Sequence, residues 1–77
     1  MSGTNADRLA NRTQQRVALN VFTFRVQHGM SQDQLAQLAG IDRKTVNRIE
    51  NGHFSPSIDT LTRLSVAFGI QITDLLT

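Results

Sequence analysis

Apolar residues recur at helical spacing in the first long segment of this 77-residue chain, and nothing between Leu9 and His28 breaks a helix. Positions three and four residues apart share one face of a helix, so this segment predicts a helix with one buried side. The residues that we expect on that side are Val17, Val21 and Phe24, with His28 as a further candidate. Gly29 is suited to end the helix, and residues 1–7 have little to bury, so we expect them to fray.

The stretch from Gln32 to Ile49 predicts two short amphipathic helices joined by a sharp turn at Gly40. Ser31 and Gln34 have the spacing of a capping box at the start of the first helix. Asp42 precedes the second helix, where its carboxylate can accept amide hydrogen bonds. The residues expected at the contact between the helices are Ala36, Ile41, Val46 and Ile49. A small residue, a glycine and apolar residues in this register are typical of a helix-turn-helix.

The remainder of the chain predicts two further helices. Asn51-Gly52 is typical of a helix end, and Ser57 can cap a fourth helix from about Ile58 to Phe68. Its expected inner face consists of Ile58, Leu61, Leu64 and Phe68. After Gly69, we expect Thr73 to cap a last short turn. Because no alternating strand pattern of useful length occurs, we predict a compact all-α domain of about five helices. Residues 12–77 form this domain, and residues 1–11 form an arm that is flexible or extends the first helix.

Composition narrows the function further. The chain has no cysteine, its two histidines are far apart, and it has no nucleophile–base arrangement, so we expect no metal, no cofactor and no enzymatic activity. No apolar run approaches the roughly 18 residues that span a bilayer, so we expect a cytoplasmic, nucleoid-associated protein. The net charge is only +2, but the basic residues form two groups. They are Arg8, Arg12 and Arg16 in the first group and Arg43, Lys44 and Arg48 in the second.

The second helix of the motif carries the side chains expected to read DNA bases, namely Arg43, Lys44, Thr45, Asn47 and Arg48. Arginine and lysine can donate to guanine, and asparagine can pair with adenine through both of its amide atoms. The residues expected to contact the DNA backbone are Gln32, Ser31, Asn51, His53, Ser55, Arg16 and Arg12. Two of these assignments have an equally plausible alternative. His53 can be an ordinary loop histidine without a DNA contact, and the arginine row can be a solvated helix face.

Residues 17–76 resemble the phage-repressor and Cro-like (XRE) helix-turn-helix family. The resemblance is carried by Gly29-Met30-Ser31-Gln32, Leu35-Ala36-Gln37-Leu38-Ala39-Gly40, Val46-Asn47-Arg48-Ile49-Glu50-Asn51-Gly52 and Pro56-Ser57-Ile58-Asp59-Thr60-Leu61. It implies a five-helix repressor-like domain that binds a two-fold symmetric operator as a homodimer and regulates transcription. It also implies that Gln32 braces the DNA-facing surface and that Arg25 and Glu50 form a structural ion pair. A restriction–modification controller, an antitoxin-like autoregulator and a protein-interaction module of the same fold remain alternatives.

One departure from the family lies on the first helix. Leu19, Phe22 and Val26 form a second apolar stripe on the side opposite the core residues. A helix that is apolar on two sides must cover both. We therefore expect the N-terminal extension or another protein chain to pack on this stripe. Dimerisation is also expected to involve the C-terminal part, where the candidate residues are Val66, Ile70, Ile72 and Leu76.

Overall fold

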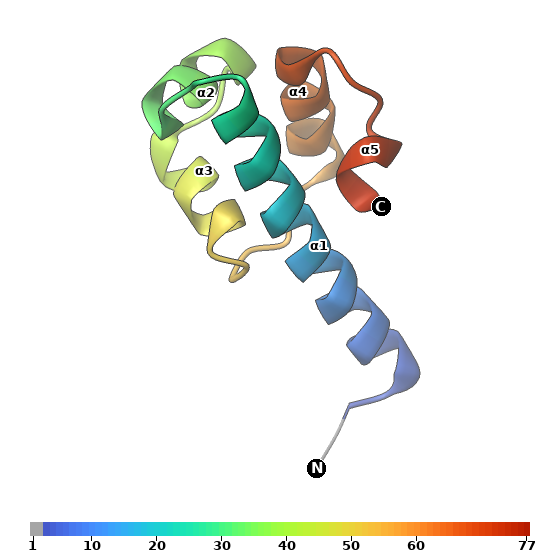
Figure 1. The fold of residues 1–77 in the computed structure, drawn as a ribbon. Helices are drawn as coiled ribbons and strands as arrows, with labels where there is room; N and C mark the ends of the chain where they lie inside the picture. The colour runs from blue at the N-terminus through green and yellow to red at the C-terminus, as the bar shows by residue number, and fades with distance from the viewer. Residues whose placement is uncertain (1–2) are drawn as a thin grey trace.

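Five helices and no strand make up residues 3–77, which are the residues that the computed structural model describes (Figure 1). The helices are α1 (Asn5–Gln27), α2 (Gln32–Ala39), α3 (Arg43–Glu50), α4 (Ile58–Phe68) and α5 (Thr73–Leu76). The long α1 runs across the molecule, with α2 and α3 on one flank and α4 and α5 on the other. This arrangement confirms the predicted all-α fold.

The start of α1 differs from the prediction. Thr4 caps the helix, because its hydroxyl accepts the Asp7 amide proton at 3.1 Å while Asp7 accepts the Thr4 amide proton at 3.1 Å. The expected fraying of residues 1–7 is therefore wrong from Thr4 onward, while residues 1–2 lie outside the described part. The Thr-x-x-Asp spacing was a signal that the sequence already contained. Residues 5–13 are all exposed, and this part of α1 extends past the body of the domain (Figure 1).

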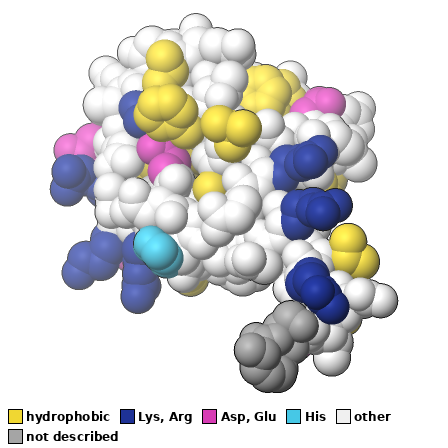
Figure 2. Space-filling model, turned by 60° about the horizontal axis from the view of Figure 1, so that its bottom comes forward, with side chains coloured by type: hydrophobic (Ala, Val, Ile, Leu, Met, Phe, Trp, Pro, Cys, Tyr) yellow, Lys and Arg dark blue, Asp and Glu magenta, His cyan; other side chains and the backbone are white. Residues whose placement is uncertain are grey.

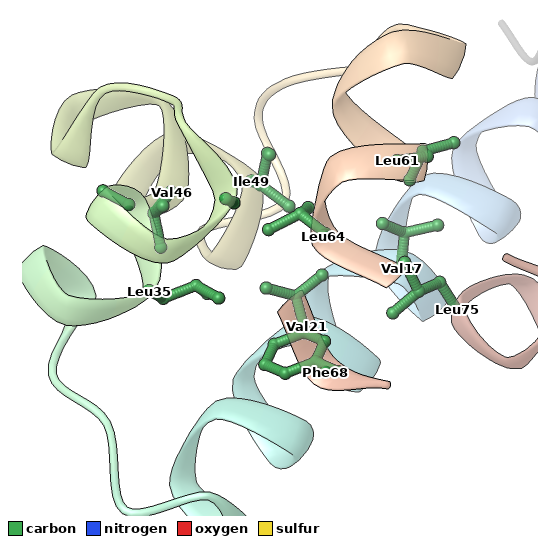
Figure 3. Close-up of a cluster of buried hydrophobic side chains, with 11 residues drawn as sticks. Val17, Val21, Leu35, Val46, Ile49, Leu61, Leu64, Phe68 and Leu75 are labelled. Atoms are coloured by element: carbon green, nitrogen blue, oxygen red, sulfur yellow. The ribbon is translucent and has the colours of Figure 1, made fainter. Parts of the chain in front are cut away.

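The core is built from all five helices, which is why so short a chain can enclose one. Figure 3 shows the buried side chains pointing toward a common centre: Val17, Val21, Leu35, Val46, Ile49, Leu61, Leu64, Phe68 and Leu75. Phe24 is half-buried at its edge, with its ring centroid 5.5 Å from that of Phe68. The helical spacing therefore identified most of the core correctly.

Two residues predicted to face the core do not. Ile58 is 72% exposed because it opens α4, and helical spacing identifies a face of a helix without showing whether another element reaches that turn. His28 is also exposed and lies at the rim. Its Nδ1 is 2.7 Å from the Phe24 carbonyl oxygen and its Nε2 is 3.2 Å from the Phe68 carbonyl oxygen, so its ring joins the carboxyl ends of α1 and α4.

The predicted caps fall into two groups. The capping box of Ser31 and Gln34 is confirmed, and so is the Ser57 cap, whose hydroxyl accepts the Thr60 amide proton at 3.1 Å. Asp42 occupies the capping position of α3, but its side chain makes no capping hydrogen bond.

The predicted Thr73 cap of α5 is wrong, because Ile72 occupies the capping position there. Instead, the Asp74 carboxylate accepts the amide proton of Gln71 at 3.0 Å and closes the turn. Residue type identifies a possible cap, but the direction of the side chain decides whether the bond forms.

Gly40 makes the turn between α2 and α3. Its φ of 71° lies in the left-handed region that residues with a Cβ disfavour. The amide of Ile41 then donates to the Ala36 carbonyl at 3.0 Å, which closes the end of α2. Ala36 is buried, so the two helices can approach closely at this point. The turn thereby sets the angle at which α3 leaves the body.

Candidate nucleic-acid interface

The α3 helix has one buried side and one exposed polar side. Val46 and Ile49 are almost completely buried and anchor the helix to α2 and α1. Among the residues predicted to read bases, Thr45 is half-buried. The others, Arg43, Lys44, Asn47 and Arg48, are exposed. An anchored helix with exposed donors is suited to enter the major groove of DNA.

An ion pair ties α1 to the end of α3. Arg25 Nε lies 2.6 Å from Glu50 Oε2, and Arg25 Nη2 donates to Glu50 Oε1 at 3.0 Å. The side chains of Arg25 and Glu50 are only 14% and 5% exposed. Hydrogen bonding to Glu50 raises the pKa of Arg25 above its ordinary value, because it outweighs the opposing effect of burial. Arg25 also donates through Nη1 to the Met30 carbonyl at 2.8 Å, so the pair fixes the start of the motif as well.

A chain of amide side chains extends from this ion pair to the exposed face of α3. Gln32 Nε2 donates to Glu50 Oε1 at 3.0 Å, and Gln32 Oε1 accepts from Asn47 Nδ2 at 3.4 Å. Asn51 Nδ2 then donates to Asn47 Oδ1 at 3.1 Å. A carboxylate can only accept hydrogen bonds, so Gln32 must turn its amino group toward Glu50. The charge of Glu50 therefore orients both amides, including that of Asn47.

The two arginines of α3 have further partners that sequence reasoning missed. Arg43 Nε lies 3.8 Å from Asp33 Oδ1 in the first turn of α2, and both side chains are well exposed. The guanidinium carbon of Arg48 lies 5.7 Å from the centroid of the Phe54 ring. Phe54 is half-buried against the core, so the loop after α3 orients this arginine. An aromatic residue in that loop was the only signal for this contact.

The residues predicted to contact the DNA backbone do not all lie together. Gln32 and Ser31 lie at the start of α2, and Asn51, His53 and Ser55 lie in the turn and loop that follow α3. The hydroxyl of Ser31 already accepts a hydrogen bond within its own capping box. Independently of the Ser31 side chain, the amino end of α2 is a favourable position for an anion, because the helix dipole and the first backbone amides point toward it.

Arg12 and Arg16 belong to a separate group on α1. Arg16 Nη1 donates to the Thr77 carbonyl at 3.1 Å, which directs this arginine toward the α5 flank rather than toward α3. Figure 2 shows Lys and Arg side chains in two separate groups, one of which lies beside the grey N-terminal residues. The side chains of Gln14 and Gln15 both donate to the Gly52 carbonyl, at 2.7 and 3.0 Å, and tie α1 to the turn after α3.

The apolar stripe of α1 remains largely exposed in the single chain, although the guanidinium carbon of Arg25 lies 5.4 Å from the centroid of the Phe22 ring. Leu19, Phe22 and Val26 are 64%, 47% and 53% exposed. The expectation that the N-terminal extension packs on them is wrong, because residues 5–13 continue the helix instead of folding back. The alternative expectation, that another protein chain packs on this stripe, stays a prediction.

The C-terminal candidates for a dimer contact divide between the core and the surface. Ile70 and Ile72 are half-buried and pack against the core. Val66 and Leu76 are exposed, at 74% and 38%. Ile70 and Ile72 therefore contribute to the core, while Val66 and Leu76 leave apolar surface exposed, and a dimer contact through this region stays a prediction.

Comparison with known proteins decides the family. Residues 23–75 match the family described as helix-turn-helix. The chain belongs to this helix-turn-helix family. The resemblance found in the sequence is thereby confirmed, and the match includes both helices of the motif as well as α4 and most of α5.

Relatives of this helix-turn-helix chain carry the names of regulators. An uncharacterised HTH-type transcriptional regulator of Methanocaldococcus jannaschii is 33% identical over 52 residues, which are 68% of this chain and 79% of that protein. A similar regulator of Haemophilus influenzae is 41% identical over 56 residues, or 70% of this chain and 57% of that protein. Their names describe transcriptional regulators rather than enzymes.

Solved structures of the family superpose closely. A hypothetical transcription factor from Neisseria aligns with a TM-score of 0.81 and 29% identity, over 84% of this chain and 75% of that one. The restriction–modification controller protein C.AhdI from Aeromonas hydrophila aligns with a TM-score of 0.77 and 29% identity, over 80% of this chain and 94% of that chain.

Within residues 3–77, no helix is long and apolar enough to cross a membrane.

Proposed function

We propose that this protein is a sequence-specific DNA-binding regulator of transcription that inserts α3 into the major groove. The exposed polar face of α3, anchored by Val46 and Ile49 and braced by the Arg25–Glu50 pair, is the observation that carries this proposal. Membership of the helix-turn-helix family and the regulator names of its relatives support it.

Each exposed side chain of α3 has a role in the proposed complex. Arg43 and Lys44 lie in the first turn, where a recognition helix comes closest to base edges, and they would donate to guanine O6 and N7. Asn47 would pair with adenine N6 and N7, and Arg48 would contact a base or a phosphate beside Phe54. The amino end of α2 at Gln32 would bind a phosphate, together with Asn51, His53 and Ser55.

We further propose that the protein binds a palindromic operator as a homodimer. One α3 helix of 8 residues contacts only a few base pairs, so a single copy can distinguish few DNA sequences from one another. Two copies related by a two-fold axis would read two half-sites about 34–36 Å apart. The product of two modest specificities would then distinguish an operator from other DNA.

A controller of restriction–modification genes is the second candidate for the biological role. The alignment with C.AhdI, which covers 94% of that protein, is the observation that favours it. A protein-interaction module without DNA binding is less consistent with α3, because its exposed face carries Arg43, Lys44 and Arg48. These residues give the helix a positive charge that suits phosphate and guanine.

Selection of bound sequences from random double-stranded DNA tests this proposal. We expect a palindromic consensus with two half-sites, and we expect Asn47→Ala to lose preference at one base in each half-site. Gln71→Ala is a matched control, since Gln71 is exposed and lies far from α3 in the sequence. Selection that enriches no sequence, with the folded state verified by circular dichroism, would contradict the proposal.

A further inference from the structure

Two side chains of α1 hold the turn that follows α3. Gln14 Nε2 and Gln15 Nε2 donate to the Gly52 carbonyl oxygen at 2.7 and 3.0 Å, and a carbonyl oxygen has two lone pairs, so both bonds can form together. Gly52 is buried, and a Cβ there would lie 2.6 Å from Gln15 Oε1, so the missing side chain lets α1 approach the turn. Both glutamines precede residues 23–75, which match the helix-turn-helix family. The family match therefore does not account for this contact.

The backbone of the turn offers hydrogen-bond donors to a ligand. The amide of Gly52 donates to the Ile49 carbonyl at 3.0 Å and completes the end of α3. Within residues 3–77, the next three amides, those of His53, Phe54 and Ser55, donate to no acceptor. His53 and Ser55 are exposed, so an anion can reach this part of the turn. Successive backbone amides in turns bind anions in many phosphate sites.

Phe54 connects this turn to Arg48. The Phe54 ring is half-buried against the core, and the guanidinium carbon of Arg48 lies 5.7 Å from its centroid. A cation–π contact does not consume the N–H donors of the guanidinium, so they stay available to an anion. Arg48 follows Arg43 by five residues, which is about 7.5 Å along α3 at 1.5 Å per residue. When the amino end of α3 contacts base edges, Arg48 therefore lies further from them and beside the turn.

We propose that Arg48 and the turn of residues 53–55 form a phosphate clamp, which binds the DNA backbone whatever the base sequence. Phe54 positions Arg48 within this clamp, and Gln14 and Gln15 position the turn. This inference rests on the proposed function and deepens it, because it assigns Arg48 to a phosphate rather than to a base. It also gives the amino-terminal half of α1 a role in DNA binding, through the turn that it holds.

Preorganisation is the physical reason for such a role. A segment that is already ordered loses less conformational freedom when it binds. The two glutamine bonds fix the start of the turn, and the packing of Phe54 against the core fixes its middle. Since phosphate contacts carry no base sequence, the phosphate clamp raises the affinity for every duplex and leaves the preference for an operator unchanged.

The first test measures binding to the selected operator and to an unrelated duplex of equal length, at several salt concentrations. We expect Arg48→Gln to weaken binding to both duplexes by a similar factor, about 10-fold, as the loss of a charged hydrogen bond implies. The slope of log K against log salt should flatten by about 0.9, the value for one phosphate contact. The matched contrast is Arg43→Gln, which should weaken binding to the operator more than to the unrelated duplex. A loss of preference at one base in Arg48→Gln would assign this arginine to base reading and overturn the proposal.

The second test determines whether Phe54 acts through Arg48. We expect Phe54→Leu, which keeps an apolar side chain against the core, to weaken binding to both duplexes about 3-fold. Phe54→Tyr keeps the ring and should bind like the natural chain. When Arg48→Gln is already present, Phe54→Leu should have no further effect. An equal loss with and without Arg48 would show that Phe54 only packs against the core, and would overturn its positioning role.

The third test replaces both glutamines with methionine, which has a similar length but donates no hydrogen bond. We expect Gln14→Met/Gln15→Met to lose affinity for both duplexes by the same factor. In NMR spectra, the amide signals of residues 53–55 should shift when the unrelated duplex is added to the natural chain, and shift less in the double variant at equal occupancy. Gln27→Met/Gln71→Met is the matched control, since both of these glutamines are exposed. Amide signals of residues 53–55 that do not respond to DNA would overturn the proposal.

These outcomes separate the phosphate clamp from sequence-specific recognition. If selection enriches no sequence but Arg48→Gln still weakens binding to the unrelated duplex and flattens the salt slope, the proposed function fails and the phosphate clamp remains. If a palindrome is enriched but Arg48→Gln and the double glutamine variant bind it like the natural chain, the phosphate clamp fails and the proposed function remains.

Discussion

The flank of α1 that faces α3 and the face of α1 that points away from the body are built in opposite ways. On the α3 flank, Arg25, Glu50 and Gln32 satisfy one another through directional hydrogen bonds within a single chain. On the outward face, Leu19, Phe22 and Val26 are apolar and about half exposed or more, and the guanidinium carbon of Arg25, 5.4 Å from the centroid of the Phe22 ring, covers only part of them. A polar network completes itself inside the fold, whereas an apolar face gains stability only when something excludes water from it. The comparison teaches that one flank of α1 fixes the orientation of α3, while the opposite face leaves apolar side chains in contact with solvent.

The largest expected effect concerns the polar flank. Arg25→Met leaves the Glu50 carboxylate largely buried without its cation, and such a loss costs about 3–5 kcal/mol. Chemical denaturation of the two proteins measures it as a difference in the free energy of unfolding. The control is Arg63→Met, which breaks an exposed ion pair with Asp59 and should cost about 0–1 kcal/mol. Equal losses in the two variants would show that the Arg25–Glu50 pair does not brace the domain.

The turn that positions α3 gives the next effect. Gly40→Ala forces an alanine into the left-handed region, which costs about 1–2 kcal/mol. The added Cβ would also lie 3.0 Å from Arg63 Nη1, at the end of a flexible side chain that can move. Gly69→Ala has nearly the same φ, at 70°, and no neighbour within 4 Å of its Cβ, so it measures the backbone strain alone. We expect similar thermal destabilisation of the two variants, and a much larger loss for Gly40→Ala would show that Arg63 cannot move away.

The amide chain between Glu50 and Asn47 predicts a coupling in DNA recognition. Asn47→Ala should lose about 1–3 kcal/mol of discrimination at one base, measured by binding to operators that differ there. Gln32→Ala should lose part of the same discrimination, because Asn47 can then rotate its amide. The double variant should lose less than the sum of the two single losses. Additive losses would show that Gln32 acts on DNA independently of Asn47.

The smallest effect concerns the basic residues of α1. If Arg8, Arg12 and Arg16 bind DNA phosphates, replacing them with glutamine should flatten the dependence of log K on log salt by about 0.9 for each phosphate that is no longer bound. Titrations of operator binding at several salt concentrations measure this slope. An unchanged slope would assign the row to a solvated helix face rather than to DNA.

Most of the fold followed from local signals in the sequence. Helical spacing identified the buried residues of α1, and the Ser31–Gln34 and Ser57 caps marked the starts of α2 and α4. These signals act over one or two turns, so they do not require knowledge of distant contacts. Ile58 was misplaced because its burial depends on what lies beside the first turn of α4. The start of α1 was missed although Thr4 and Asp7 carried the signal.

The candidate site divides in the same way. The exposed residues of α3 could be identified from its period and polarity, because the opposite side of the helix had to be buried. The contacts of Phe54 with Arg48 and of Gln14 and Gln15 with Gly52 could not, because they join segments that meet only in the folded chain. The orientation of the Asn47 amide likewise depends on a carboxylate and a glutamine brought together by tertiary packing.

The sequence by itself determined the all-α class, the helix-turn-helix register and the residues that α3 exposes, because capping and hydrophobic period are local properties of the chain. It also contained the apolar stripe of α1. Only the tertiary structure decided that α1 continues straight instead of covering that stripe, and that α3 and α5 lie on opposite flanks of it. Those are relations between distant segments, and they depend on how all five helices enclose one core.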